Sequence, residues 1–412
     1  MAAGPPLDRT ETAPAAHPQE PTMTTTHFIP SETTDEQPSA PAEQPTAAMR
    51  PGHHTEPIDP VRLRRVLKAY TTRFVAAAIE SAGDGYHLEL GSDVVPRAGD
   101  VVLARVVEIG KHTRLESPVS RRQLLFPGRE ILVAYGDRYA PDQFLAHVPS
   151  SLAPTDLVAG GGLASEVIEM HASIDGATRI EPLGLLADRH GRVTLDRFAP
   201  LGSTATLAAP RSEGRPPVIA VFGSSMNSGK STVLGSIVNG LVGAGLQVAA
   251  GKSTGTGAGN DPHHFRDAGA STVLDFTDFG HATTYRLGDQ RIREIFVDMV
   301  DELAATGPDV VVIEVADGVY QEETRRLLED PAFHERVDRV VFASQDALGA
   351  VAGMQVLDAA GVTTAAVSGV VTSSPLATSE AGQVLSVPVI GTFDLREPHT
   401  ALSLLPSGHL AS

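Results

Sequence analysis

The sequence predicts an α/β protein with a smaller β-rich domain over residues 59–208 and a doubly wound, mostly parallel sheet over 218–412. Three observations predict this fold class. Apolar runs without polar alternation recur in the C-terminal half, as strands covered on both faces require. Stretches with helical spacing separate most of these runs. Short alternating runs between Gly, Asp and Pro turns fill the earlier part. The C-terminal apolar runs lie at 218–222, 247–250, 310–315, 339–343, 364–371 and 387–390.

Composition excludes several classes of function. The formal net charge of −18 argues against a nucleic acid as the main partner. Because the chain has no cysteine, it has no disulfide, thiolate zinc site, iron–sulfur cluster or cysteine nucleophile. The apolar runs are shorter than the roughly 18 residues of a membrane helix, and the N-terminus lacks a basic-then-apolar signal pattern. We therefore expect a soluble cytoplasmic protein with no membrane partner.

Two segments are expected to lie outside the folded domains. Residues 1–58 are rich in proline, with 12 of the 30 prolines in the first sixty residues, and Phe28 is the only aromatic there. Such a segment buries too little apolar surface to offset its ordering entropy, so it is predicted to be a disordered tail. Residues 209–217, with four prolines and glycines, are predicted to be a linker.

The region 59–208 has the pattern of a small barrel or sandwich. An amphipathic stretch begins after Asp59. Alternating runs predict strands, and glycine-rich turns separate them. The triplet Gly160-Gly161-Gly162 is interpreted as a turn in preference to a ligand loop. The predicted strands lie at 72–79, 86–90, 101–109 and 130–134.

The strongest motif directly follows the run at 218–222 and directly precedes a helical pattern. Backbone N–H groups in such a loop cradle phosphate oxygens at the positive end of the helix. Lys230 would neutralise the β and γ oxygens, and the Ser231 hydroxyl would reach Mg²⁺. The motif therefore predicts a phosphate-binding P-loop. Its residues are Gly223, Ser224, Ser225, Met226, Asn227, Ser228, Gly229, Lys230, Ser231 and Thr232.

The motif departs from the usual G-x-x-x-x-G-K-[ST] pattern at one position. That pattern places glycine at 224, where this chain has Ser224, and Gly223 lies one residue earlier. The helix that follows supports the interpretation, because Val233, Ile237 and Leu241 form an apolar row at i, i+4 spacing.

A second cation is predicted at the end of the next strand. Lys252 follows the run at 247–250 and precedes a loop with three glycines. Ligands bind beyond the carboxyl ends of strands in open α/β sheets, so Lys252 should lie near the transferred phosphoryl group. Asp261, in the same loop, is a candidate to contact metal or substrate. His263 and His264 are adjacent and are not expected to form a metal site.

The run at 310–315 has the form of a Walker B strand. Four apolar residues end in Glu314, where a carboxylate can hold Mg²⁺ directly or through water. An unpaired acid inside a buried strand would otherwise cost several kcal/mol. Asp317, three residues later beside Gly318, is predicted to be a second acid for metal or substrate.

Further loops are candidates for contacts with substrate or base. Asp275 and Asp278 either enter the same pocket or simply end a helix, and the sequence leaves both interpretations open. The guanine-reading pattern N-K-x-D is absent after the runs at 339–343 and 364–371. Adenine is therefore favoured, and ATP with Mg²⁺ is the predicted cofactor pair.

The order of these pieces, over about 217–395, resembles the dethiobiotin synthetase group of P-loop proteins. In that group five residues separate a first glycine from G-K-[ST], a lysine ends the second strand, and E-G-A-G-G ends the third. Val315 and Asp317 depart from that last motif. The loops at 225–230 and 254–259 are closer to a poorly characterised bacterial P-loop family, itself distantly similar to the domain family of D-glutamate N-acetyltransferases. The resemblance implies a P-loop NTPase fold.

These observations predict an ATP- and Mg²⁺-dependent enzyme that phosphorylates or activates a small metabolite with a carboxylate or an amine. Lys230, Lys252, Asp261 and Asp317 are the predicted catalytic residues, and Ser231 and Glu314 the predicted metal ligands. Two alternatives remain: an N-acyltransferase whose P-loop holds the phosphates of acyl-CoA, and a nucleotide-driven switch or metallochaperone. The partner is expected to be a small molecule, and a homodimer is left open.

Overall fold

The computed structural model describes residues 52–82, 85–203, 205–206 and 214–407. Most of the predicted tail and residues 209–213 of the predicted linker lie outside these ranges. The predicted tail boundary at residue 58 is wrong, because β1 (His54–Pro57) pairs with β3 (His87–Leu90). Ordered structure thus begins before Asp59.

Five strands of the N-terminal part pair in a closed ring, which makes a small barrel. In ring order they are β4 (Val101–Glu108), β7 (Glu130–Tyr135), β11 (Leu163–Met170), β10 (Thr155–Ala159) and β12 (Thr178–Asp188). Strand β12 closes the ring by pairing with β4, and only the β7–β11 pair is parallel. The barrel is one of the two arrangements that the alternating pattern predicted.

Shorter elements extend the barrel. They are α1 (Pro60–Arg65), β2 (Leu67–Lys68), α2 (Arg73–Ala82), β5 (Arg114–Glu116), β6 (Arg122–Leu124), β8 (Arg138–Tyr139), β9 (Phe144–His147), β13 (Gly191–Arg192) and the short 3₁₀ helix η1 (Leu195–Arg197). The strand predicted at 72–79 is wrong, because α2 occupies this segment. Val75 and Ile79, four residues apart, are both buried on one helix face, and the alanines between them favour a helix.

Two sets of apolar side chains form the barrel cores. One set, with Leu103 and Leu132, packs with Leu63 of α1 and Val75 of α2. The other set includes Val102 and Val133 and contains no residue from either helix. A ring of five strands is too narrow to admit a helix, so the first set faces outward and the second fills the barrel.

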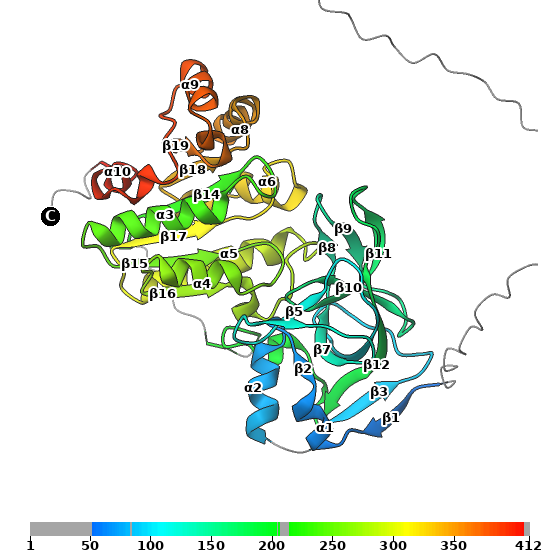
Figure 1. The fold of residues 1–412 in the computed structure, drawn as a ribbon. Coiled ribbons are helices and arrows are strands. Elements are labelled where there is room, and N and C mark those ends of the chain that lie inside the picture. Colours follow the sequence, from blue (N-terminus) through cyan, green and yellow to red (C-terminus); the bar gives the residue numbers. More distant parts are fainter. Residues whose placement is uncertain (1–51, 83–84, 204, 207–213, 408–412) are drawn as a thin grey trace, which may run out of the picture. The chain divides into compact units, whose positions relative to one another are not determined.

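The C-terminal part contains a six-stranded parallel sheet in the order β16-β15-β17-β14-β18-β19 (Figure 1). Its strands are β14 (Val218–Gly223), β15 (Val248–Lys252), β16 (Thr272–Asp275), β17 (Val310–Glu314), β18 (Arg339–Ala343) and β19 (Thr364–Ser368). The edge strand β16 was not predicted, because its four residues alternate in burial and lack a continuous apolar run. The run at 387–390 was wrongly expected to be a strand, since Val389 makes only an isolated bridge with Val367.

Helices cover both faces of this sheet, as a doubly wound fold requires. Side chains of α3, α4, α10 and η4 pack on one face, and those of α5 to α9 pack on the other. The bounds are α3 (Lys230–Gly243), α4 (Asn260–Asp267), η2 (Phe276–Phe279), α5 (Asp289–Ala305), α6 (Glu322–Glu329), α7 (Pro331–Arg336), α8 (Ala347–Ala359), η3 (Val370–Ser373), α9 (Pro375–Val384), η4 (Asp394–Arg396) and α10 (Pro398–Leu402).

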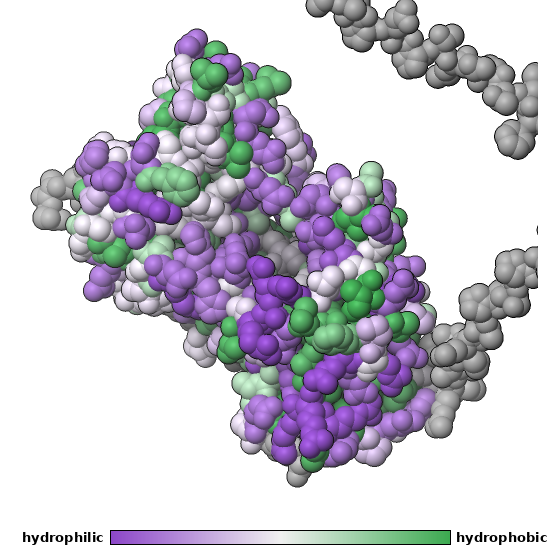
Figure 2. Space-filling view, in the orientation of Figure 1, coloured by the Kyte–Doolittle hydropathy of each residue, from purple (hydrophilic) through white to green (hydrophobic). Residues whose placement is uncertain are grey.

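The barrel and the parallel sheet belong to one compact unit of the chain. At one point of contact, a side chain on Gly161 of the barrel would overlap the carbonyl of Gly257, in the loop after β15. Figure 2 shows hydrophilic side chains over much of one face of the molecule, with hydrophobic side chains scattered among them. Among the residues that the structure describes, no helix is both long and apolar enough to span a membrane.

Candidate functional site

The phosphate loop runs from the end of β14 to the start of α3 and folds over Gly223. A Cβ at Gly223 would overlap Ser228 Oγ and lie 2.9 Å from Lys230 Cγ. This close packing explains why glycine stands at 223. Asn227 and Gly229 supply the left-handed turns, with φ of 61° and 95°. Glycine is therefore needed one position earlier than in the usual motif, and Ser224 needs no special backbone conformation.

Neighbouring strands hold the loop in place. The Ser224 amide donates to Ala343 O at 2.9 Å, and the Val370 amide donates to Ser228 O at 3.1 Å. The Gln345 side chain donates to Met226 O at 3.1 Å. The loop is thus fixed by the ends of β18 and β19 before any phosphate binds.

Lys230 opens α3 and is 6% exposed. Its ammonium donates to Ser225 O at 2.8 Å. Burial lowers the pKa of Lys230, whereas the carboxylates of Glu314 and Asp317 oppose that shift. The lysine therefore lies folded onto its own loop, where phosphate oxygens could replace the carbonyl as its partner.

Strand register brings Lys252 beside Glu314. The two residues are paired across the parallel strands β15 and β17, and Lys252 Nζ lies 3.4 Å from Glu314 Oε1. Lys252 also forms an ion pair with Asp261, at the start of α4. Burial would lower the pKa of Lys252, but the two carboxylates outweigh it and the net shift is upward. Burial likewise raises the pKa of Asp261, but Lys252 outweighs it and lowers the pKa overall.

Glu314 keeps one oxygen without a partner. The side chain is 1% exposed, and its Oε2 is buried with no hydrogen-bond partner among the described residues. Such an orphaned carboxylate oxygen is what a cation site would use. Ser231 and Asp261 line the same cavity as Glu314, so a hydroxyl and two carboxylates converge here. Within the described ranges, no group of three or more His, Cys, Asp or Glu side chains is arranged so that it could hold a metal ion by itself. Mg²⁺ fits this donor set, because it commonly uses one or two carboxylates plus phosphate and water.

Asp317 lies in the loop after β17 with a left-handed backbone, φ 67°. The next residue, Gly318, is packed so closely that a Cβ would lie 2.5 Å from Ser224 O. Burial raises the pKa of Asp317 to about 6, although Lys230 and Lys252 oppose the shift. Across the described part of the chain, no hydrogen bond or ion pair to the Asp317 side chain is formed. Its carboxylate is therefore available to a ligand.

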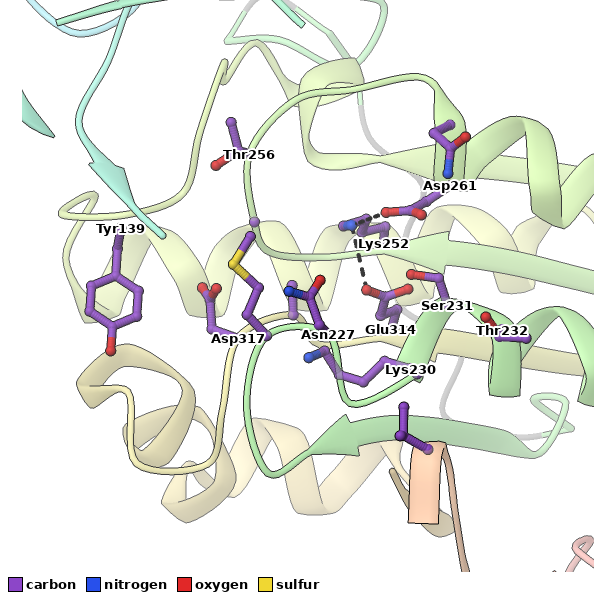
Figure 3. Close-up of a pocket in the computed structure, with 16 residues that line it drawn as sticks. Tyr139, Asn227, Lys230, Ser231, Thr232, Lys252, Thr256, Asp261, Glu314 and Asp317 are labelled. Atoms are coloured by element: carbon purple, nitrogen blue, oxygen red, sulfur yellow. Dashed lines mark hydrogen bonds and ion pairs between the residues drawn. The ribbon is translucent and has the colours of Figure 1, made fainter. Parts of the chain in front are cut away.

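One cavity of about 570 Å³ contains these groups (Figure 3). Ten predicted site residues line it: Met226, Asn227, Gly229, Lys230, Ser231, Thr232, Lys252, Asp261, Glu314 and Asp317. Gly223, Ser224, Ser225 and Ser228 are not among its lining residues and shape the loop behind it. The lining also includes Tyr139, Gly255, Thr256, Asn260, Ala316 and Val370, which were not predicted. No sequence signal marks Tyr139, because it comes from the barrel.

Asp275 and Asp278 do not enter the cavity. They form a capping box around η2, and Asp275 also accepts a hydrogen bond from Tyr70 OH at 2.8 Å. Arg73 of the barrel part donates to Asp278 at 2.7 Å. The hypothesis that Asp275 and Asp278 enter the pocket is therefore wrong. Both acids bind side chains at or just before the start of α2.

The loops considered for base recognition serve as helix caps. Asp346 Oδ1 accepts from the Gly349 amide at 2.6 Å at the start of α8. Ser374 Oγ accepts from the Ala377 amide at 3.3 Å at the start of α9. Both side chains therefore already have a backbone amide as their partner.

Known proteins resemble this chain only distantly. No protein-family model and no curated protein match it. Among solved structures, the signal recognition particle receptor FtsY from Elizabethkingia anophelis is 18% identical with a TM-score of 0.32, over 51% of this chain and 69% of that one. Signal recognition particle 54 kDa protein from Aeropyrum pernix K1, solved with GDP, is 19% identical with a TM-score of 0.32, over 51% of this chain and 50% of that one. Chloroplast FtsY from Physcomitrella patens is 17% identical with a TM-score of 0.33, over 50% of this chain and 70% of that one.

None of these three structures is a dethiobiotin synthetase, and at such scores no function transfers to this chain. The chain's own geometry is more informative. A parallel strand leads through a loop with Gly223, Gly229 and Lys230 into a helix, and the adjacent strand ends in Glu314. This arrangement is a P-loop NTPase fold.

Proposed function

We propose that this protein is a Mg²⁺- and ATP-dependent enzyme that phosphorylates or activates a small molecule bound in the same cavity. The observation that carries the proposal is that Lys230, Glu314 and Asp317 all line one cavity of about 570 Å³. A cavity of this size accommodates a nucleotide together with a small acceptor.

The residues divide into two roles. Lys230 and the loop amides would hold the phosphates, and Lys230 would exchange Ser225 O for phosphate oxygens. Ser231 and the orphaned oxygen of Glu314 would hold Mg²⁺, which supplies charge neutralisation at the β and γ phosphates. Lys252, tied to Asp261 and Glu314, is fixed in position and would stabilise charge that develops on the transferred group.

In the transfer step, a lone pair on the acceptor attacks the γ phosphorus. The bond from that phosphorus to the bridging oxygen breaks, and ADP leaves with the electron pair. The acceptor's proton passes to solvent, and Asp317 orients the acceptor for the attack. Asp317 suits this role better than Asp261, because Asp261 already pairs with Lys252. Positioning and charge neutralisation supply most of the rate in such reactions.

The nucleotide is proposed to be ATP because the guanine-reading pattern N-K-x-D is absent. The likeness to the dethiobiotin synthetase group supports activation of a small molecule, but Val315 and Asp317 argue against the same substrate. A homodimer fits this proposal and is not required by it, since all the groups named above come from one chain.

Isothermal titration calorimetry tests nucleotide binding. ATP, GTP and acetyl-CoA are titrated into the full chain, with Mg²⁺ and with a chelator, and Lys230→Ala serves as the binding-deficient control. We expect ATP to bind in a Mg²⁺-dependent manner, more tightly than GTP. Tight acetyl-CoA binding without Mg²⁺ would instead favour the N-acyltransferase.

Turnover is then followed by ADP release with pooled amino acids, amines and organic acids. Acceleration by a pool supports the proposal. If ATP is hydrolysed slowly and no pool changes the rate, a nucleotide-driven switch becomes the better description.

A further inference from the structure

The cavity has two chemically different ends. At one end Lys252 lies between Asp261 and Glu314, so its charge is already neutralised. Tyr139 and Asp317 line the other end, and Figure 3 shows Asn227 next to Asp317. The first end belongs to the phosphates and metal, which leaves the second end for the acceptor.

Tyr139 is held at this end by contacts between the barrel and the P-loop part. It belongs to β8, which pairs with β9 in a hairpin. Asp142 in the turn accepts a hydrogen bond from Asn227 of the phosphate loop at 3.1 Å. Asp137, just before β8, forms an ion pair with Arg286 at 3.5 Å. The Tyr139 ring lies 5.5 Å from that of Tyr285. The hairpin is thus part of the cavity wall.

Asp317 supplies an acidic side chain to this end of the cavity. Asp317 has no hydrogen-bond or ion-pair partner within the described residues, and Glu323 adds to the negative field around it. Lys230 and Lys252 are the cations that act most on Asp317, but Lys230 donates to Ser225 O and Lys252 is paired with Asp261 and Glu314. Arg138 is buried as well. Its guanidinium donates to Gln143 at 3.0 Å and lies 3.4 Å from the His112 ring nitrogen. Among the described residues, none of these three cations therefore forms an ion pair with Asp317.

We propose that the Tyr139–Asp317 end is a subsite for the ammonium group of an amine-bearing acceptor. The Asp317 carboxylate would form a charge-assisted hydrogen bond with the ammonium, and the Tyr139 ring would add a cation–π contact. A carboxylate at this position would face Asp317 and the surrounding acids and be repelled. This proposal rests on the proposed function and narrows its acceptor from a carboxylate or amine to an amine.

Two matched pools test the substrate class. One contains short aliphatic diamines and amino alcohols, and the other contains the dicarboxylic and hydroxy acids of the same chain lengths. ADP release by the full chain is measured with ATP and Mg²⁺. We expect the amine pool to accelerate release and the acid pool to have no effect.

Three variants and two controls then test the residues with the active amine. Asp317→Asn should raise the KM of the amine at least about tenfold, with the Kd of ATP within about twofold, because only a charge-assisted contact is lost. Tyr139→Ala should raise the KM of the amine about threefold or more. Tyr139→Phe should leave this KM unchanged, because the face of the ring makes the contact. Asp358→Asn and Tyr320→Ala, both exposed and outside the cavity, are the matched controls. Calorimetry with ATP shows that each variant is folded.

Each contrary result has a distinct meaning. Absence of ATP binding would overturn the proposed function itself. If ATP binds and the acid pool accelerates release, or neither pool does, the amine subsite is overturned and nucleotide binding stands. An unchanged amine KM in a folded Asp317→Asn protein would likewise reject Asp317 as the ammonium ligand.

Discussion

Glu314 pairs with Lys252 through only one of its two carboxylate oxygens. Oε1 lies 3.4 Å from Lys252 Nζ, whereas Oε2 is buried and has no hydrogen-bond partner among the described residues. A buried lone oxygen is costly unless a ligand completes it. The pair therefore fixes the orientation of the carboxylate and directs its second oxygen to a cation.

This relationship predicts that Glu314→Gln separates chemistry from nucleotide binding. The amide keeps the volume but loses the charge that holds Mg²⁺. We expect kcat to fall by at least about a hundredfold, roughly 2.7 kcal/mol in barrier, while the Kd of the nucleotide changes by less than about fivefold. ADP release at limiting Mg²⁺ and calorimetry measure the two quantities. Glu329→Gln, an exposed change on α6, is the control. Near-normal turnover of Glu314→Gln would remove this residue from the metal site.

Lys230→Ala is expected to lower nucleotide affinity at least about tenfold, because a charge-assisted contact worth about 1.5–3 kcal/mol is lost. The fold should persist, since the lysine's hydrogen bond is to Ser225 O in its own loop. Calorimetry gives the affinity, and circular dichroism checks the fold. Unchanged binding of ATP, ADP and acyl-CoA in the variant would contradict the assignment of the phosphate loop.

Tyr70→Phe tests the attachment of the barrel to the parallel sheet. The substitution removes the 2.8 Å hydrogen bond to Asp275, and both residues are buried. We expect the free energy of unfolding in urea to drop by about 1–2 kcal/mol. Tyr320→Phe, 70% exposed, should leave stability unchanged. Equal stability of the two variants would show that the Tyr70 hydroxyl contributes nothing to the folded state.

The pKa of Asp317, raised by burial to about 6 from 3.8, predicts a pH dependence of stability. A carboxyl with a raised folded pKa binds more protons in the folded state, so its contribution to stability is present at low pH and is lost as pH rises through about 6. Asp317→Asn removes this loss. The variant should therefore gain in melting temperature relative to wild type as pH rises from about 4 to about 7.5.

Differential scanning fluorimetry across this range checks the prediction. A difference in melting temperature that does not change with pH would contradict the prediction. It would instead reflect the tolerance of asparagine for a left-handed backbone, since φ is 67° at this position.

Local chemistry explains which parts of the fold could be predicted from sequence. The runs at 218–222 and 310–315 are continuous and apolar because β14 and β17 are covered on both faces. The same pattern placed Glu314 at the end of a strand and Lys230 at the start of the helix that follows the phosphate loop. By contrast, Thr272–Asp275 alternates as an edge strand, and the alanine-rich segment of α2 was misinterpreted because its buried residues also fit a short alternation.

The parts of the site that depend on long-range contacts had no local signal. Tyr139 reaches the cavity through long-range contacts of its hairpin, among them the Asp142–Asn227 hydrogen bond between segments 85 residues apart. Asp275 and Asp278 resembled site acids, but their partners Tyr70 and Arg73 lie about two hundred residues earlier in the chain. Pairings of this kind follow from tertiary packing and not from composition.

The contact between Gly161 and Gly257 limits how this protein can be rebuilt. Because a single methyl group at Gly161 would overlap the carbonyl of Gly257, the two glycine loops must be inherited together. A chimera that joins this barrel to the P-loop part of another protein would need a loop without a side chain at the position that contacts Gly161. Recombination in evolution or in the laboratory should therefore preserve the two loops as one module, despite the distance between them in the sequence.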